Sequence, residues 1–287
     1  MAKIINEINN ILLPRVCFGC NAQLFSGERI LCAVCRHDVP LTDHNYLEEN
    51  AVDRRFYGRI PIKKAASFVF FTKNGLVKNL LHWLKYKNQE QIGGFFGEWC
   101  GALLMENGQL KNVDAVVPVP LHPKKLKKRG YNQVALFAKT IAEQIGATYC
   151  DDWLIKTKNI KTLTKKNRQS RWESSKDAFT LNASNHRKYK HVLLVDDVIT
   201  TGATIESCTK TLLQQKGVSV SVLTMAVVPS AAAFSYIAII ACTCDGLAVA
   251  RVGSAAIISV MICGVGKHVC TAPIAMEHNK EHHVSCG

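Results

Sequence analysis

The sequence is poor in negative charge, and its start lacks the apolar run of a secretory signal. It has 22 aspartates and glutamates against 36 lysines and arginines, for a formal net charge of +14. No apolar signal core follows residues 1–3, so we expect a cytoplasmic protein. Twelve cysteines in 287 residues are too few for a secreted scaffold held by disulfides, so paired cysteines indicate metal before disulfide. A hydrophobic content of 48% excludes a disordered or collagen-like chain.

The positive charge is distributed unevenly along the chain. Residues 111–190 contain 18 of the 36 basic residues but only 6 of the 22 acidic ones. A positive field of this kind attracts polyanions, which include nucleic acid, a polyphosphorylated small molecule and an anionic membrane. Charge alone does not choose among these partners, and a basic surface without any partner is the remaining alternative.

Charged residues are almost missing from a stretch of fifty residues near the end of the chain. Residues 217–266 contain only Asp245 and Arg251. The uncharged run 227–244 is close to the lower length limit for a membrane span, but small and polar residues dilute it. We therefore expect 227–287 to be an atypical extension that is disordered, aberrant through a shifted reading frame, or membrane-associated. The sequence leaves open adventitious metal binding by side chains near its end, namely His278, His282, His283 and Cys286.

Strand-like and helix-like patterns alternate in the middle of the chain. The runs 113–120 and 191–195 predict buried strands, and 191–195 is apolar on both faces, as a central parallel strand should be. Helical apolar spacing follows a predicted break at Gly93-Gly94 and recurs over 134–145. The alternation predicts an α/β fold with a largely parallel sheet flanked by helices.

Three domains are expected on this basis. An N-terminal helix and a small cysteine-containing domain occupy 1–58, the α/β domain occupies 59–226, and the extension occupies 227–287. The boundaries follow the shifts in composition and patterning along the sequence.

Four cysteines near the N-terminus have the spacing of a metal site. Two Cys-x2-Cys pairs are separated by eleven residues, and their members are Cys17, Cys20, Cys32 and Cys35. Two such pairs can place four thiolates around one tetrahedral zinc ion. Redox-active dithiols and unligated core cysteines are the alternatives. A closed shell of four sulfurs leaves no open coordination position, so the zinc is expected to be structural.

The segment 192–204 combines acids with a turn of small residues. A buried strand runs into Asp196 and Asp197, and a turn rich in threonine and glycine then opens a helix. Converging backbone N–H groups, hydroxyls and a helix N-terminus are suited to a phosphate monoester. The acids could accept hydrogen bonds from vicinal hydroxyls or help to hold a hydrated magnesium ion. A sugar with a 5-phosphate and free vicinal hydroxyls would satisfy both the turn and the acids. The alternative is an acidic helix cap beside a turn of small residues.

The same segment resembles the phosphoribosyl pyrophosphate (PRPP) binding motif of type I phosphoribosyltransferases. Both have four apolar residues, two acids, two apolar residues and Thr-Thr-Gly-x-Thr. The resemblance implies a type I phosphoribosyltransferase-like sheet, with Asp196 and Asp197 on the ribose hydroxyls and Mg²⁺ accompanying PRPP. It also implies that the 5-phosphate is cradled by Thr200, Thr201, Gly202, Ala203 and Thr204. The segment has no Gly-Lys-Ser/Thr of a Walker loop.

Further blocks, together with the paired cysteines, are similar to the ComF family of competence proteins. These blocks are 82–87, 117–122 and 129–133, and the similarity extends from residue 1 to about 226. Ser174-Ser175 departs from the family pattern, where Asn-Val is usual. The resemblance implies a role in natural transformation, with single-stranded DNA and a DNA-processing protein as partners.

A loop and a basic run follow the strand predicted at 113–120. By resemblance to phosphoribosyltransferases, the loop of Pro120, Leu121 and His122 would bring backbone amides to a pyrophosphate, which Arg129 and neighbouring lysines would neutralise. The run 124–129 could equally be a solvated face or a patch for a nucleic-acid backbone. The basic stretch 156–171 fits either a flap over pyrophosphate or a surface that tracks DNA.

Two functions remain open at this level. One is a protein that binds PRPP or a nucleotide and assists DNA uptake or processing. The other is an active phosphoribosyltransferase in nucleotide metabolism or salvage, whose acceptor the sequence does not identify. A membrane-attached accessory role depends on the extension alone.

Overall fold

The computed structural model describes residues 15–106, 110, 112–157, 178–184 and 189–229, together with two short strands near the C-terminus. Two compact units are distinguished, residues 1–228 and 229–287. In the second unit, β8 (Ile262–Cys263) pairs antiparallel with β9 (Val269–Cys270). The predicted N-terminal helix, the basic stretch at 158–171 and the remaining predictions for the extension lie outside the described residues. No helix in the described part of the chain has both the length and the apolar character needed to cross a bilayer.

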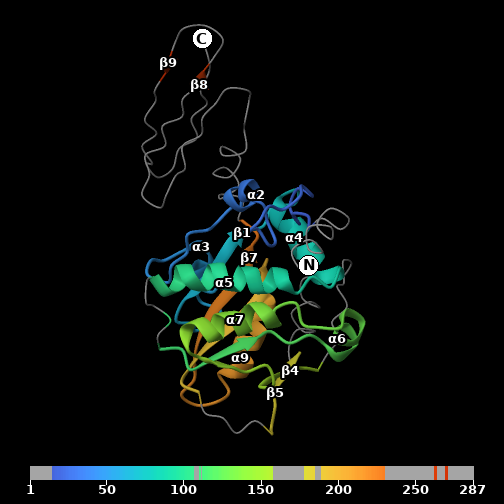
Figure 1. Cartoon of the computed structure of the whole chain (residues 1–287). Coiled ribbons are helices and arrows are strands. Elements are labelled where there is room, and N and C mark those ends of the chain that lie inside the picture. The colour runs from blue at the N-terminus through green and yellow to red at the C-terminus, as the bar shows by residue number, and fades with distance from the viewer. Residues whose placement is uncertain are drawn as a thin grey trace, which may run out of the picture. The chain divides into compact units, whose positions relative to one another are not determined.

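The first unit is built on a five-stranded parallel sheet. Its strand order is β1-β7-β6-β2-β3, and Figure 1 labels the neighbouring strands β1 and β7. The strands are β1 (Ala65–Phe70), β7 (Ser219–Val227), β6 (His191–Ile199), β2 (Ala115–Pro118) and β3 (Thr148–Tyr149). The predicted parallel α/β fold is therefore confirmed.

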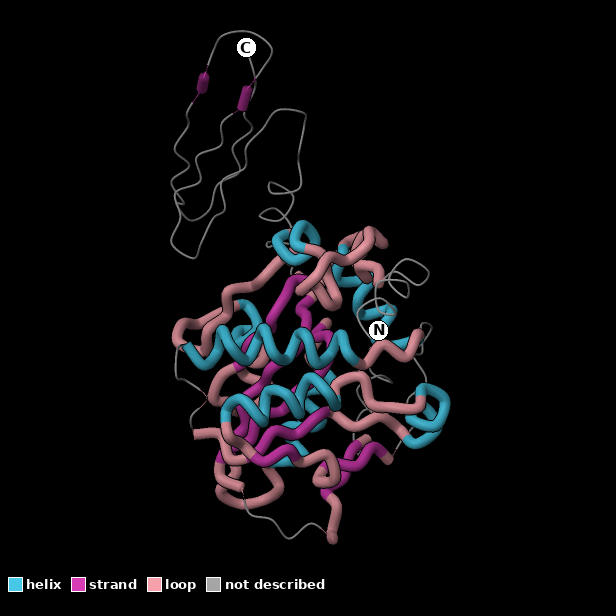
Figure 2. Tube along the Cα trace, in the orientation of Figure 1, coloured by secondary structure: helices cyan, strands magenta, loops and turns pink. Residues whose placement is uncertain are grey.

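Helices cover both faces of this sheet, as the layers in Figure 2 show. One face packs against α4 (Leu76–Tyr86), α5 (Gln91–Glu106) and α7 (Ala135–Ile145). The other face packs against α3 (Ala51–Arg54), α9 (Ala203–Leu212) and the antiparallel pair of β4 (Leu154–Lys156) and β5 (Phe179–Leu181). Two further short helices, α2 (Ala33–His37) and α6 (Pro123–Arg129), complete the described elements.

The predicted helix break at Gly93-Gly94 is wrong, because α5 runs through both glycines. Their absence of side chains lets α7 approach closely. A Cβ atom on Gly94 would lie 3.1 Å from Leu136 Cδ2, and one on Gly97 would lie 2.8 Å from Thr140 Cβ. The helical cost of about 1 kcal/mol per glycine is offset by this close packing, which Figure 1 shows as two adjacent helices.

Side chains of β6 alternate between the two faces of the sheet, as those of any strand do. Leu193 and Val195 belong to the core beneath α4, α5 and α7. Val192 and Leu194 belong to the core beneath α9. From Val192 to Val195 both faces of β6 are fully buried, which explains why this stretch is continuously apolar rather than alternating.

The order of the strands creates a switch point between β6 and β2. From β2 the chain continues to β3 at one edge of the sheet, whereas from β6 it continues to β7 in the opposite direction. In open α/β sheets, ligands bind beyond the carboxyl ends of the strands at such a switch point. The topology therefore directs attention to the residues at the end of β6 and just after β2.

Candidate functional site

The two adjacent acids lie within β6, because this strand continues to Ile199 instead of ending before them as the sequence suggested. Strand alternation consequently gives them different surroundings. Asp197 Oδ2 lies 2.7 Å from Lys85 Nζ on α4 and accepts a 2.8 Å hydrogen bond from Gln133 Nε2. Asp197 Oδ1 accepts a hydrogen bond from the backbone N–H of Val198 at 2.5 Å. One carboxylate thus joins the sheet, α4 and the segment before α7.

Asp196 is buried and less well neutralised. Its Oδ1 atom accepts a 2.8 Å hydrogen bond from the backbone N–H of Asp197. Burial, with the nearby charge of Asp197, raises the pKa of Asp196 to about 7, while Lys85 and Lys156 oppose the rise. The two acids are therefore chemically unequal: Asp197 carries a salt bridge, and Asp196 titrates near neutral pH.

Lys156 approaches this region from β4, at the start of the segment that leads into residue 158. Its ammonium lies 4.8 Å from the ring centroid of Phe179. Burial lowers the pKa of Lys156, and both acids act against that decrease. Lys156 therefore adds a second positive charge to the environment of the acids.

The threonine-rich turn lies directly beyond the end of β6. Gly202 is the N-cap of α9 and has φ = +79°, a conformation that strains any residue with a side chain. The side chains of Thr200, Thr201 and Thr204 are exposed. The N–H groups in the first turn of a helix have no partner within it, so the start of α9 offers donors to an anion. One of them, the N–H of Ala203, makes a long 3.5 Å contact with Thr201 Oγ1.

Two arginines contact this turn, and no sequence motif pointed to them. Arg55 donates to the carbonyl oxygen of Thr200 and to that of Val228. Arg59 donates to the carbonyl oxygen of Thr201 at 2.9 Å and lies 2.5 Å from Glu206 Oε2. Both arginines thus engage carbonyl oxygens of the turn and not its N–H groups. No pattern near residues 55–59 relates them to the motif 142 or more residues later, so only the fold reveals the contact.

The predicted pyrophosphate loop lies after β2, next to β6. Pro120, Leu121 and His122 are partly exposed, and His122 Nδ1 caps α6 by accepting a 3.2 Å hydrogen bond from the N–H of Lys124. Arg129, at the end of α6, donates to Gln133 Oε1 and stacks on Tyr86, with its guanidinium carbon 5.6 Å from the ring centroid. Through Gln133, Arg129 is linked to Asp197. The fold therefore connects the predicted basic contact with the acids.

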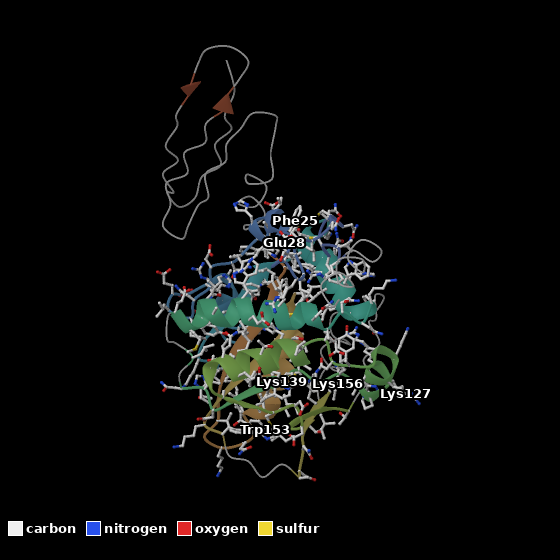
Figure 3. All side chains as sticks on the ribbon, viewed as in Figure 1. Phe25, Glu28, Lys127, Lys139, Trp153 and Lys156 are labelled. Atoms are coloured by element: carbon white, nitrogen blue, oxygen red, sulfur yellow. The ribbon has the colours of Figure 1, made fainter. Side chains whose placement is uncertain are left out.

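The lysines of α6 project into solvent. Lys124, Lys125, Lys127 and Lys128 are all exposed, and Figure 3 shows Lys127 at the outer side of this helix. They form a basic surface next to the loop after β2. In contrast, Trp153 is only 1% exposed and packs edge-to-face on Tyr189, so it is a core residue.

The four predicted metal ligands come together in one cluster. The sulfur atoms of Cys17, Cys20, Cys32 and Cys35 all lie within 4.8 Å of one another, and those of Cys20 and Cys32 are 3.7 Å apart. Zn–S bonds of about 2.3 Å in a tetrahedron place sulfurs about 3.8 Å apart. The donor set and its spacing therefore fit a four-coordinate zinc ion.

Backbone hydrogen bonds favour the thiolate form of Cys17. The N–H groups of Gly19 and Cys32 both point to Cys17 Sγ, at 3.3 Å each. Burial acts to raise the pKa of Cys17, but hydrogen bonds from Cys32, Cys20 and Gly19 outweigh it and lower the pKa to about 7. A metal ion binds the thiolate and not the thiol, so this arrangement favours coordination.

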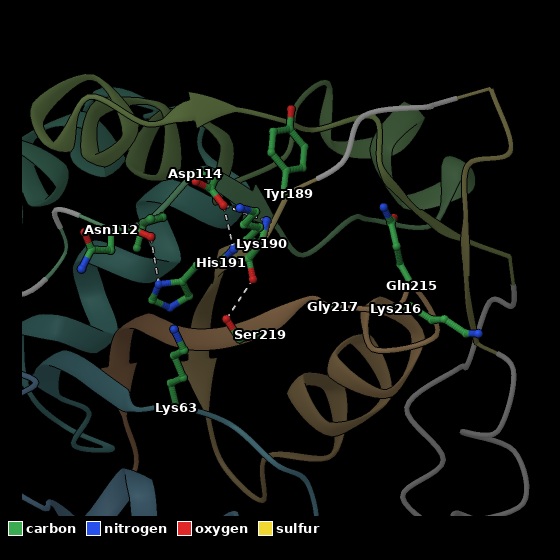
Figure 4. Close-up of a pocket in the computed structure, with 11 residues that line it drawn as sticks. Lys63, Asn112, Asp114, Tyr189, Lys190, His191, Gln215, Lys216, Gly217 and Ser219 are labelled. Carbon is green, nitrogen blue, oxygen red and sulfur yellow. Dashed lines mark hydrogen bonds between the residues drawn. The ribbon is translucent and has the colours of Figure 1, made fainter.

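A cavity of about 990 Å³ lies at the amino-terminal ends of the strands, opposite to the ends that carry the acids (Figure 4). Its lining includes Lys63, Asp114, His191 and Ser219. The carboxylate of Asp114 accepts hydrogen bonds from the backbone N–H groups of Lys190 and His191, at 2.7 and 2.8 Å. Within the described residues, its lining contains neither the acids nor the threonine turn, so this cavity is separate from the predicted site.

Comparison with known proteins agrees with this geometry. A family profile described as the phosphoribosyl transferase domain matches residues 134–256. Competence protein F of Haemophilus influenzae is 36% identical over 111 residues, which cover 38% of this chain and 48% of that protein. Competence protein ComFC of Bacillus subtilis is 26% identical over 213 residues, covering 74% of this chain and 83% of that protein. The chain is therefore similar to ComF-family competence proteins, and part of it matches the phosphoribosyl transferase domain.

The similarity to this family is spread over most of the first unit. DNA utilization protein YhgH of Escherichia coli is 24% identical over 229 residues, covering 74% of this chain and 96% of that protein. The alignment with competence protein F is shorter and spans about half the length of that relative.

Among solved structures, the allosteric regulatory enzyme of purine biosynthesis matches with a TM-score of 0.35 and 17% identity, covering 51% of this chain and 30% of that one. A hypoxanthine phosphoribosyltransferase from Staphylococcus aureus matches with a TM-score of 0.29 and 15% identity, covering 50% of this chain and 76% of that one.

Proposed function

We propose that this protein binds PRPP or a nucleotide at the end of β6 and assists DNA uptake or processing during natural transformation. The observation that carries the proposal is the position of the acids and the threonine turn. Both lie at the carboxyl end of β6, beside the switch point of the sheet, where α/β folds bind their ligands. The names of the relatives, which refer to competence and DNA utilization, support the cellular role.

The roles of the residues follow from their surroundings. The turn from Thr200 to Thr204 would hold the 5-phosphate with hydroxyls and the N–H groups at the start of α9. Asp196 has one oxygen that accepts no hydrogen bond from the described residues, so it is the acid best placed to accept from a ribose hydroxyl. Asp197 would act mainly through its contacts with Lys85 and Gln133. Mg²⁺ bound with PRPP would offset charge on the pyrophosphate.

We also propose that the four-cysteine cluster holds structural zinc. Four sulfurs close the coordination shell, so this metal would stabilise the small domain around α2 and would take no part in chemistry. The exposed lysines of α6 are the proposed contact for the backbone of single-stranded DNA, since they are basic, adjacent and unburied.

Calorimetry with PRPP and Mg²⁺ tests the site. Wild-type protein should bind, and Asp196→Ala/Asp197→Ala should weaken binding at least about tenfold, equivalent to about 1.4 kcal/mol. An Asp151→Ala/Asp152→Ala variant is the matched control, because it also removes two adjacent acids but lies after β3, outside the site. Absence of binding to wild-type protein would remove the proposal.

The second candidate is an active phosphoribosyltransferase, favoured by the match to the phosphoribosyl transferase domain. Release of pyrophosphate from PRPP upon addition of a base or nucleotide acceptor would support turnover. Binding of PRPP without any release, across a broad panel of acceptors, would support the binding role instead.

A further inference from the structure

Lys85 occupies a central position in the site, although it comes from α4, outside the segment matched by the family profile. Its Nζ atom lies 2.7 Å from Asp197 Oδ2, and its side chain is only 22% exposed. Gln133 donates to the same oxygen at 2.8 Å. Two donors from two different segments therefore fix the orientation of one carboxylate at the end of β6.

Charge balance makes this contact important for a phosphorylated ligand. Asp196 and Asp197 are adjacent and nearly buried, with 8% and 9% of their surfaces exposed. Two carboxylates in such surroundings repel each other and any approaching phosphate. An ammonium group in direct contact offsets one of the two negative charges. Lys85 can therefore keep an anionic ligand from being repelled by the acids beneath it.

The rest of α4 is held by the cysteine-containing domain. Phe18, between Cys17 and Cys20, packs edge-to-face on Trp83, with ring centroids 5.5 Å apart. Leu76, at the start of α4, packs against Gly19, where an added Cβ would lie 2.4 Å from Leu76 Cδ1. The first turn of α4 and Trp83, two residues before Lys85, thus contact the loop between the first two cysteines.

The end of α4 is also fixed from the other side. Tyr131 donates from its hydroxyl group to the carbonyl oxygen of Leu84. Leu84 is fully buried, and Lys85 is the next residue. The path from the cysteine cluster to Asp197 therefore passes through one short helix of 11 residues, with contacts along its length.

We propose that Lys85 is a positioning residue of the ligand site and that the cysteine-containing domain holds it in place through α4. Lys85 acts on the ligand through Asp197: it fixes that carboxylate and offsets its charge, so that a phosphorylated ribose can be accommodated above the acids. The inference rests on the proposed function. It assigns a share in the site to residues that precede the segment 134–256 matched by the phosphoribosyl transferase profile.

Three full-length variants test the role of Lys85 by calorimetry with PRPP and Mg²⁺. Lys85→Met keeps the aliphatic length without the charge and should weaken binding at least about tenfold. Lys85→Arg should recover most of that decrease, to within about threefold of wild type, because it restores a cation near Asp197. Lys78→Met is the control, as it removes an exposed lysine from the same helix, and it should bind like wild type.

The outcomes distinguish this inference from the proposed function. If wild-type protein binds PRPP and Lys85→Met binds equally well, the inference is overturned while the proposed function stands. If wild-type protein does not bind, the proposed function itself fails. A weakening in Lys85→Met that Lys85→Arg does not recover at all would overturn the role assigned to the charge. Circular dichroism should show that all three variants are folded.

The contribution of the cysteine-containing domain has its own test. Trp83→Leu removes the ring that packs on Phe18, and it should weaken PRPP binding about threefold or more in a folded protein. Phe25→Ala, in the same domain but 75% exposed, is the control and should bind like wild type. Equal binding by Trp83→Leu and wild type would overturn the part of the inference that involves the cysteine-containing domain.

Discussion

The ammonium of Lys85 and the carboxylate of Asp197 are 2.7 Å apart, although 111 positions separate them in the printed sequence. The pair joins α4 to β6. From the sequence, both acids were expected to contact the ribose hydroxyls of a ligand. Asp197 is consequently part of the framework of the site, and Asp196 beside it keeps one oxygen that no described residue engages. The two acids therefore differ in their contacts: Asp197 is held by Lys85 and Gln133, whereas Asp196 accepts one backbone hydrogen bond.

The pKa of Asp196 predicts how stability depends on pH. Because the folded-state pKa is about 7 and the ordinary aspartate pKa is 3.8, the folded protein binds this proton more tightly than the unfolded chain does. The free energy of unfolding should therefore fall as pH rises from about 4 to 7, and remain lower above that range. Asp196→Asn should remove this component. Urea unfolding at pH 5 and pH 8 checks the prediction. Between these pH values, we expect the free energy of unfolding of wild type to decrease by about 1 kcal/mol or more relative to that of the variant.

A different result would be informative about the acid pair. If wild type and Asp196→Asn showed the same change between the two pH values, the proton would not be bound at Asp196. Comparing the two proteins at each pH cancels the contribution of titrating groups that do not interact with Asp196.

Gly202→Ala should destabilise the protein more than Gly217→Ala does. Both glycines have nearly the same positive φ, +79° and +81°, so both substitutions carry a similar backbone cost of about 1 kcal/mol. Only at Gly202 would the new Cβ collide, 2.8 Å from Cε1 of the fully buried Phe56. Thermal unfolding should show a larger decrease in Tm for Gly202→Ala. Equal decreases would mean that Phe56 does not confine the turn.

Disruption of the cysteine cluster should remove bound zinc and destabilise the protein. Cys17→Ser/Cys20→Ser takes away two of four sulfurs that lie within 4.8 Å of one another. Elemental analysis should find about one zinc per wild-type chain and little in the variant, with a clear decrease in Tm, because metal binding contributes directly to folding in such sites. Val34→Ser, on exposed surface of α2, should retain the metal. Undiminished zinc in the cysteine variant would refute the site.

Binding of single-stranded DNA should depend on the lysines of α6. Replacing Lys124, Lys125, Lys127 and Lys128 by alanine should weaken binding and flatten its dependence on salt, by about 0.7 in the log–log slope for each phosphate that is no longer neutralised. Lys78→Ala/Lys139→Ala, two exposed lysines on α4 and α7, should change little. Fluorescence anisotropy with a labelled oligonucleotide at several salt concentrations measures both quantities. A slope unchanged by the four substitutions would contradict the prediction.

Sequence patterns anticipated the main features of the fold. The apolar block 191–195 became the core of β6, and the stripe at 134–145 became α7, because burial on two faces or on one leaves different periodicities in the sequence. The pattern misjudged Gly93-Gly94, since local propensity treats glycine as a breaker. The contact with α7, which makes glycine favourable there, is not a local property.

By itself, the sequence determined the residue types of the site: four cysteines at metal spacing, two adjacent acids and a turn of threonine and glycine. Each of these is a short segment whose chemistry depends on neighbours along the chain. Their contacts with one another depend on how distant segments pack in the folded chain. The tertiary structure extended β6 through the acids and so separated their surroundings, and it brought Lys85 to Asp197 and Arg59 to the threonine turn. Such contacts arise from how the helices pack against the sheet, and no spacing within a segment encodes them.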